Sequence, residues 1–216
     1  MAIQIIGDTG APLEVELNDK NQARVSIVSR GNGFCLSSAT GTMAATLAAN
    51  ATVFAMRLDT GTGARAFIDR VRWQFTTIAA FTTPITAGRA LVLSRGAGAN
   101  TTGGTALPVI PKKLSTSTTS EFGASDGGDC RIATTAALGV AGVTIEAEPI
   151  RMTALAHVGA AGAHYETIWE FATSESTPVV IEPGQLLMIR NGPNAMGAGG
   201  TWQLAVNIDW HEFTAF

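Results

Sequence analysis

The chain has 216 residues, of which 46% are hydrophobic and only 14% charged, and its formal net charge is −3. This length fits one large β domain with a substantial core. Lys112-Lys113 is the only Lys/Arg pair, so the sequence does not predict a nucleic acid as partner. No apolar run approaches the roughly 18 residues of a membrane span, so it does not predict a membrane as partner either.

Residues 1–20 are predicted to form an extended N-terminal arm, ahead of a β domain over residues 21–216. The segment does not have the sequence features of a signal peptide. Its apolar side chains suit pairing with a neighbouring subunit, and an ordinary edge strand folded on its own domain is the alternative. The predicted partner-binding residues are Ile3, Ile5, Ile6, Leu13, Val15 and Leu17.

One short helix is predicted over Thr42–Ala49, where Thr42 is a suitable N-cap and alanines dominate. Strands are predicted at Val53–Leu58 and Arg89–Arg95. Between them, one strand face is predicted to carry Phe67, Val71, Trp73 and Phe75, and the other Ile68, Arg70, Arg72 and Gln74.

Two glycine-rich stretches, Gly96–Gly104 and Ser115–Gly128, are predicted by composition to be exposed loops. Further strands are predicted between Arg131 and Ile150 and at residues 166–171, 179–181 and 186–189. Residues 182–185 fit a type II turn, because Pro183 fixes φ at the second position and Gly184 accepts positive φ at the third.

The last strand, Thr201–Phe213, carries the clearest pattern. Its large apolar residues are Trp202, Leu204, Val206, Ile208 and Trp210, and they alternate with Gln203, Ala205, Asn207, Asp209 and His211. A period of two places the apolar set on one face and the polar set toward water or a neighbouring chain. Many short strands and at most one short helix predict an all-β fold, a single antiparallel β-sandwich of jelly-roll type.

Two motif matches suggest catalysis or cofactor binding but lack the context that this chemistry needs. Gly123–Gly127 has the G-x-S-x-G spacing of a hydrolase nucleophile, but a poor helix start follows it, so a catalytic Ser125 is not favoured. Gly61–Ala66 matches a variant of the dinucleotide fingerprint without the following helix or acidic residue. We interpret it as a hairpin turn.

Metal ligation and acid–base catalysis are also not favoured. Asp126 and Asp129 offer oxygen atoms for Ca²⁺, but the ligand spacing is absent and solvated loop aspartates are the favoured interpretation. The histidines, His157, His164 and His211, lack zinc spacing. Asp209 and His211 share a strand face, which suits a hydrogen-bonded surface or interface pair. We therefore predict no enzyme activity, cofactor or metal.

The tryptophans and cysteines have structural interpretations. Trp169, Trp202 and Trp210 are predicted core residues, with a sugar-stacking platform as the less favoured alternative. Cys35 and Cys130 are predicted to be free buried thiols, and a disulfide stays open. The low charge fits either a surface covered by other subunits or a compositional bias of the source genome.

A further signal comes from the order and spacing of longer stretches. These are Ile5–Leu17, Gly41–Leu58, Gly103–Leu107, Asp129–Ile150, Ile181–Asn191 and Gly200–Phe213. Together they resemble a family of virion structural proteins from tailed bacteriophages, over nearly the whole chain. The resemblance implies a β-sandwich protein on or in the particle, implies no catalytic residues, and does not separate a head from a tail location.

Three functions remain open at this point. The leading hypothesis is a capsid cement or decoration protein, a homo-oligomer (trimer preferred) bound over the seams between major capsid subunits. It would be made in the host cytoplasm and act on the capsid surface. The alternative is a tail-tip or fibre protein that binds a receptor or glycan through its two glycine-rich loops, and the third is an esterase built on Ser125.

Overall fold

The computed structural model describes residues 16–17, 23–24, 32–44, 47–82, 89–111, 119–123, 128–155, 162–170 and 179–214. The chain divides into two compact units, Met1–Arg30 and Gly31–Phe216. In the first unit, β1 (Glu16–Leu17) pairs antiparallel with β2 (Ala23–Arg24). The second unit contains all the other strands.

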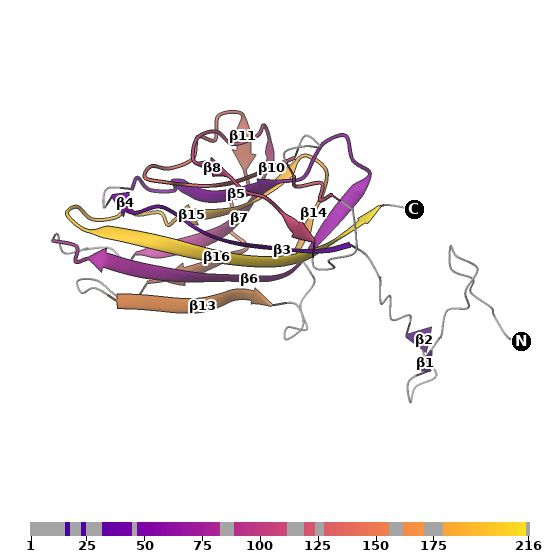
Figure 1. Ribbon diagram of the computed structural model, residues 1–216, viewed down its shortest axis with the longest axis horizontal. Coiled ribbons are helices and arrows are strands. Elements are labelled where there is room, and N and C mark those ends of the chain that lie inside the picture. The colour runs from indigo at the N-terminus through magenta and orange to yellow at the C-terminus, as the bar shows by residue number, and fades with distance from the viewer. Residues whose placement is uncertain are drawn as a thin grey trace, which may run out of the picture. The chain divides into compact units, whose positions relative to one another are not determined.

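The second unit consists of two antiparallel sheets, each named here after a central strand (Figure 1). The β16 sheet comprises β3 (Asn32–Ala39), β4 (Met43–Ala44), β6 (Ala64–Ala79), β9 (Ile110–Pro111), β13 (Gly162–Glu170), β14 (Val179–Ile181) and β16 (Thr201–Thr214). The β15 sheet comprises β5 (Thr52–Arg57), β7 (Ala90–Gly98), β8 (Thr105–Ala106), β10 (Asp129–Ile132), β11 (Val143–Ile145), β12 (Arg151–Ala154) and β15 (Gln185–Asn191). Within the described ranges there is no helix, so no helical membrane span is found there.

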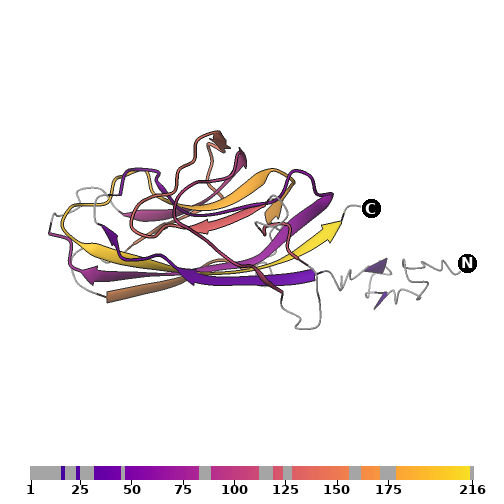
Figure 2. The same ribbon diagram turned by 45° about the horizontal axis from the view of Figure 1, so that its top comes forward.

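The strand order is that of a jelly roll. One sheet runs β13-β6-β16-β3 and the other runs β12-β7-β15-β5, with β11 also on β7. Among the strands just named, successive strands alternate between the two sheets, except that β7 is followed by β11 and β12 in its own sheet. Figure 2 shows the two sheets as facing layers. The predicted all-β sandwich is therefore confirmed.

A long excursion, residues 99–142, interrupts the jelly roll between β7 and β11. It contributes β10 beside β5 and β8 beside β10 in one sheet, and β9 beside β3 in the other. The excursion thus extends an edge of each sheet, and edges are where unpaired backbone groups would otherwise be exposed. Its β8 segment lies on the side of β5 away from β16 (Figure 1).

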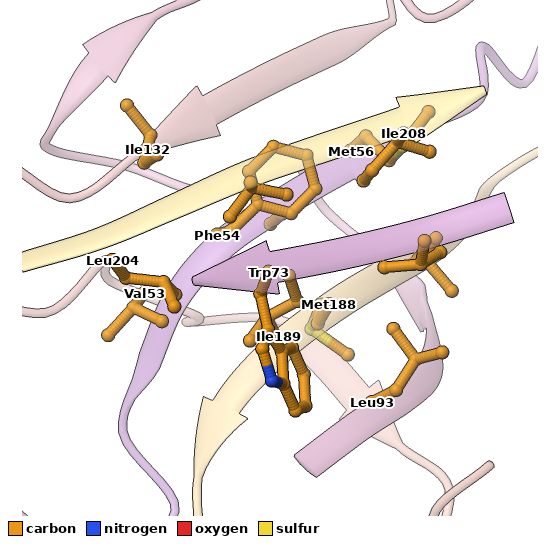
Figure 3. Close-up of a cluster of buried hydrophobic side chains, with 14 of the residues drawn as sticks. Val53, Phe54, Met56, Trp73, Leu93, Ile132, Met188, Ile189, Leu204 and Ile208 are labelled. Atoms are coloured by element: carbon orange, nitrogen blue, oxygen red, sulfur yellow. The ribbon is translucent and has the colours of Figure 1, made fainter. Parts of the chain in front are cut away.

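The core lies between the sheets and is rich in aromatic residues. Trp73, Trp202 and Trp210 are among the largest fully buried side chains. Figure 3 shows Trp73 of the β16 sheet in one cluster with Phe54 and Ile189 of the β15 sheet. The alternation predicted for β16 is confirmed, and the core interpretation holds for Trp202 and Trp210. The side chain of Trp169 lies outside the described residues.

The central strands of the β15 sheet are buried on both faces. Every residue of β5 is buried, and so are the neighbours Leu187 and Met188 of β15. Consecutive strand residues point to opposite faces, so an apolar layer must also cover the face away from the β16 sheet. The excursion also pairs with the end of β5, where the buried Leu138 donates its backbone N–H to Thr52 O at 2.8 Å.

The predicted face of β6 is wrong at its first half. Ile68 is buried and Phe67 is partly exposed, the reverse of the expectation. In the pairing of β6 with β16, Arg70 lies opposite Asp209 and Ile68 opposite Trp210, which leaves Asp69 as an extra residue. This β-bulge shifts the alternation by one position, so Phe67 faces outward.

The helix predicted over Thr42–Ala49 is also wrong in its described part. Met43 and Ala44 form β4, and Met43 lies opposite Trp202 of β16 and is fully buried. Helix propensity is a weak preference that pairing with a buried strand overrides. A turn follows, in which Asn50 adopts a φ of 59°.

Two turn predictions have opposite outcomes. The type II turn is confirmed, because Gln185 N donates to Glu182 O at 2.9 Å and Gly184 has a φ of 79°. The hairpin predicted at Gly61–Ala66 is wrong. This segment leads from β5 in one sheet to β6 in the other, and Thr62 Oγ1 accepts a hydrogen bond from Ala64 N at 3.0 Å.

Candidate functional site

Most of the predicted partner-binding residues lie outside the described part of the chain. Ile3, Ile5, Ile6, Leu13 and Val15 belong to residues 1–15. Leu17 lies in β1, opposite Ala23 of β2, so its backbone takes part in a two-stranded hairpin. The role of these residues in partner binding stays a prediction.

Asp209 and His211 of β16, which share a strand face as predicted, each have a partner on the neighbouring strand β6. Arg70 donates from Nε and Nη2 to Asp209 Oδ2 at 3.0 and 2.6 Å. His211 Nδ1 lies 2.6 Å from Asp69 Oδ2. The bulge at Asp69 is what brings two successive β6 residues to these two β16 positions. Ser125 and His157 fall outside the described residues, and His164 lies in β13.

Asp129 has a structural environment rather than that of a solvated loop residue. It is buried at the start of β10, where it accepts hydrogen bonds from Thr101 Oγ1 at 3.0 Å and Arg131 Nε at 2.9 Å. These donors occupy the oxygen atoms that a cation would need. In the part of the chain that the structure describes, no group of three His, Cys, Asp or Glu residues is placed to hold a metal; Asp126 lies outside that part.

The two cysteines lie on different sheets and form no disulfide. Cys35 is partly buried on β3, and Cys130 is buried on β10. Burial, with a smaller contribution from the charge of Asp129, raises the pKa of the Cys130 thiol far above its ordinary value. The favoured interpretation of two thiols without a disulfide is confirmed, whereas full burial of both is not, and the burial and raised pKa of Cys130 make its thiol unreactive.

The first glycine-rich stretch is exposed as predicted, although part of it is strand. Gly96–Gly98 belong to β7, and within residues 96–104 every residue except Gly96 and Thr101 is exposed. Thr101 is buried against Asp129, and at Gly104, with φ of 58°, a side chain would collide with the backbone oxygen of Ile132. Of the second stretch, 115–128, the described residues Ser120, Phe122 and Gly128 are buried.

A buried carboxylate ties the excursion to β16. Glu212 accepts hydrogen bonds from Ser120 Oγ at 2.6 Å, Glu121 N at 3.0 Å and Trp210 Nε1 at 2.8 Å. Phe122 packs edge-on against Trp210, with ring centroids 5.5 Å apart. Hydrogen bonds to a charged acceptor are stronger than neutral ones, so this cluster fixes the turn at residues 119–123 to the sandwich.

A pocket of about 370 Å³ lies beside this turn. Its lining combines the linker after β8 with the turn: Ala106, Leu107, Pro108, Val109, Thr119, Ser120 and Gly123. Small and apolar groups dominate this lining, and it includes no charged side chain. The lining includes no histidine or cysteine either, and the hydroxyl of Ser120 donates to the buried Glu212.

The outer face of the β16 sheet carries a cluster that the sequence analysis missed. We call Phe67, Val180, His211 and Phe213 the aromatic patch. Phe67 and Phe213 meet edge to face with centroids 5.1 Å apart, and His211 stacks on Phe213 at 6.4 Å. Val180 and His211 both lie opposite Phe67 in the strand register, and all four residues are partly exposed.

The sequence predicts an outward position for the patch residues of only one strand, β16. Phe213 continues the polar face of β16 two residues after His211, so its outward position follows from the alternation. Phe67 was assigned to the opposite face because the bulge at Asp69 has no mark in the sequence. Partly exposed aromatic residues on a sheet face are typical of protein–protein contact surfaces.

Comparisons with protein-family models, with curated proteins and with solved structures found no match for this chain. A functional proposal therefore depends on the fold, on the surfaces just described and on the resemblance noted from the sequence. Among these surfaces, the aromatic patch has the composition of a binding site, while the buried clusters of Asp129 and Glu212 hold the fold together.

Proposed function

We propose that this chain is a structural protein of a tailed-phage particle, a cement or decoration protein that binds between major capsid subunits. One observation carries the proposal. The chain combines a jelly-roll body, an architecture that virion proteins use, with a separate N-terminal unit whose sequence begins with an apolar run. The resemblance to phage virion proteins supports the same assignment.

The mechanism is binding rather than catalysis, and it needs no cofactor or metal. A protein that binds only the assembled shell stabilises that shell by mass action, against both heat and internal pressure. The N-terminal unit and the aromatic patch are the surfaces available for contacts with a second copy and with the major capsid protein. A homo-oligomer, preferably a trimer, places several such contacts at one seam and raises their joint affinity.

The test is the copy number of this chain in purified particles, measured by quantitative mass spectrometry against the major capsid protein. A copy number comparable to that of the capsid protein is the expected result. A handful of copies per particle would contradict the cement role and point to a tail protein that binds a receptor or glycan. Absence from the particle would overturn the virion assignment altogether.

A further inference from the structure

The aromatic patch has the form of a small docking site for an uncharged apolar segment. Phe67, Val180 and Phe213 supply its apolar part, all partly exposed on the outer face of the β16 sheet. Aromatic side chains in such positions dominate binding energy at interfaces, because they bury large areas at low cost in side-chain entropy.

The described charged side chains next to the patch have partners within the same subunit. Arg65 lies 3.4 Å from Glu182, His211 lies 2.6 Å from Asp69, and Arg70 binds Asp209. A charged ligand would have to compete with these contacts, whereas an uncharged apolar segment leaves them in place. The chemistry of the patch therefore selects for an apolar and uncharged partner.

This chain itself contains such a segment at its N-terminus. Residues 1–7, MAIQIIG, include three isoleucines and no charged side chain, and the first acidic residue is Asp8. The chain that follows this segment enters the sandwich beside the patch, since Asn32 lies opposite Glu212 and Gly33 opposite His211. The point of entry of one chain is thus one residue pair from a member of the patch.

The segment has sufficient reach to bind to a neighbouring subunit. The β1–β2 hairpin brings Glu16 opposite Arg24, so the reach depends on residues 8–15 and 25–31. Fully extended, these two stretches span at most about 50 Å. A compact body of this size has a radius of gyration of about 16 Å, which corresponds to a width of about 40 Å, so at full extension the two stretches reach across one subunit.

We infer that the aromatic patch binds the N-terminal segment 1–7 of a second copy of this chain. The inference rests on the proposed function, which requires a homo-oligomer, and it names the contact that holds that oligomer together. Exchange of a terminal segment between identical subunits is a low-cost route to closed oligomers. The chain enters the sandwich at Asn32, next to the patch. Two copies that contact each other through this end of the sandwich therefore each bind the N-terminal segment of the other.

A photo-crosslink from the patch tests this contact. The full-length protein carries a photoreactive phenylalanine analogue in place of Phe213, and the matched control carries it in place of the exposed Met152 on the other sheet. After irradiation, we expect a dimer band on a denaturing gel whose linked peptide maps to residues 1–7, for the Phe213 probe and not for the Met152 probe. Crosslinks to residues outside 1–7 would overturn the inference. So would crosslinks to residues 1–7 that are found only in the monomer band, because they would join residues of one chain.

A pair of arm variants tests whether the apolar side chains are responsible. In the Phe213-probe protein, Ile5→Asp is expected to lower the yield of dimer crosslink at least tenfold. The control Gln22→Glu adds one negative charge elsewhere in the N-terminal unit and is expected to change the yield less than twofold. Equal yields for both variants would contradict a docked apolar segment.

These outcomes are separable from those for the proposed function. A high copy number in the particle without a crosslink to residues 1–7 overturns the docking contact and leaves the virion role standing. A crosslink to residues 1–7 in a protein that is missing from particles overturns the virion role and leaves the docking contact standing.

Discussion

The jelly-roll strands and the excursion of residues 99–142 are held in place by different forces. On β16, five large side chains alternate into the core, among them Trp202 and Trp210. The excursion also buries apolar side chains such as Phe122 and Leu138, but it depends in addition on close backbone approach at Gly104 and on buried polar groups such as Asp129. The strands are thus stabilised mainly by apolar area, and the excursion by apolar area together with a few geometrically demanding contacts.

This difference predicts how a substitution in each region changes the stability of the protein. Truncating a core side chain removes apolar contacts from both sheets, so it should lower the stability of the whole sandwich. Disturbing a contact of the excursion should open a surface segment while the sheets persist, because local openings cost less than global unfolding. The variants below test that contrast, from the largest expected effect to the smallest.

The largest effect is expected for Trp202→Ala. Trp202 is fully buried, stacks on Phe75 with centroids 5.1 Å apart, and donates from Nε1 to Ala44 O at 3.2 Å. The loss should be about 3–5 kcal/mol of the free energy of unfolding, measured by denaturant titration. The control Met152→Ala, at an exposed side chain, should cost less than about 0.5 kcal/mol. Similar losses for both variants would contradict a core centred on β16.

A pair of neighbouring glycines isolates the close contact of the excursion. Gly103 and Gly104 have φ of 77° and 58°, so alanine at either position costs about 1–2 kcal/mol in backbone strain. Only at Gly104 would the new Cβ collide with the Ile132 backbone, while at Gly103 it meets open space. Gly104→Ala should therefore cost about 1–3 kcal/mol more than Gly103→Ala in thermal or denaturant unfolding. Equal costs would show that close packing does not hold the excursion.

The Glu212→Gln variant tests the polar attachment of residues 119–123. Glutamine has one acceptor oxygen, so one of the donors Ser120 Oγ, Glu121 N and Trp210 Nε1 is left without its acceptor. We expect a loss of about 1.5–3 kcal/mol, with faster hydrogen exchange at the Glu121 amide. The exposed Glu148→Gln serves as the control. Unchanged exchange at Glu121 would refute the attachment.

The smallest effect is expected for Glu146→Gln. Glu146 Oε1 lies 2.6 Å from Arg95 Nε, but the two side chains are 42% and 35% exposed. Solvent screens such a pair, so its loss should change the free energy of unfolding by less than about 1 kcal/mol, and less still at high salt. A loss comparable to that of Glu212→Gln would mean that exposed charges contribute as much as buried ones.

The two regions also differ in how far the sequence predicts them. Alternation placed Trp202 and Trp210 in the core correctly, because period two is a local property of a strand. The helix predicted at Thr42–Ala49 was wrong at Met43, whose burial depends on pairing with β16, more than 150 residues later. The packing at Gly104 depends equally on a distant partner, and composition alone predicted only an open loop.

The aromatic patch is likewise predicted from the sequence only in part. The outward position of Phe213 follows from the alternation of β16, but the neighbouring Phe67 was placed inside because the bulge at Asp69 leaves no local signal. Val180 reaches the patch through a third strand, β14, whose pairing with β6 the sequence does not reveal. The apolar residues of the N-terminal arm were recognised from pattern alone, and their role stays a prediction.

The most direct test of the cement role is addition of the purified protein to particles assembled without it. The account predicts saturable binding, with a copy number comparable to that of the major capsid protein, and a higher temperature of shell disruption measured by release of packaged DNA. Particles that bind no protein, or that bind it without any gain in heat resistance, would contradict the account.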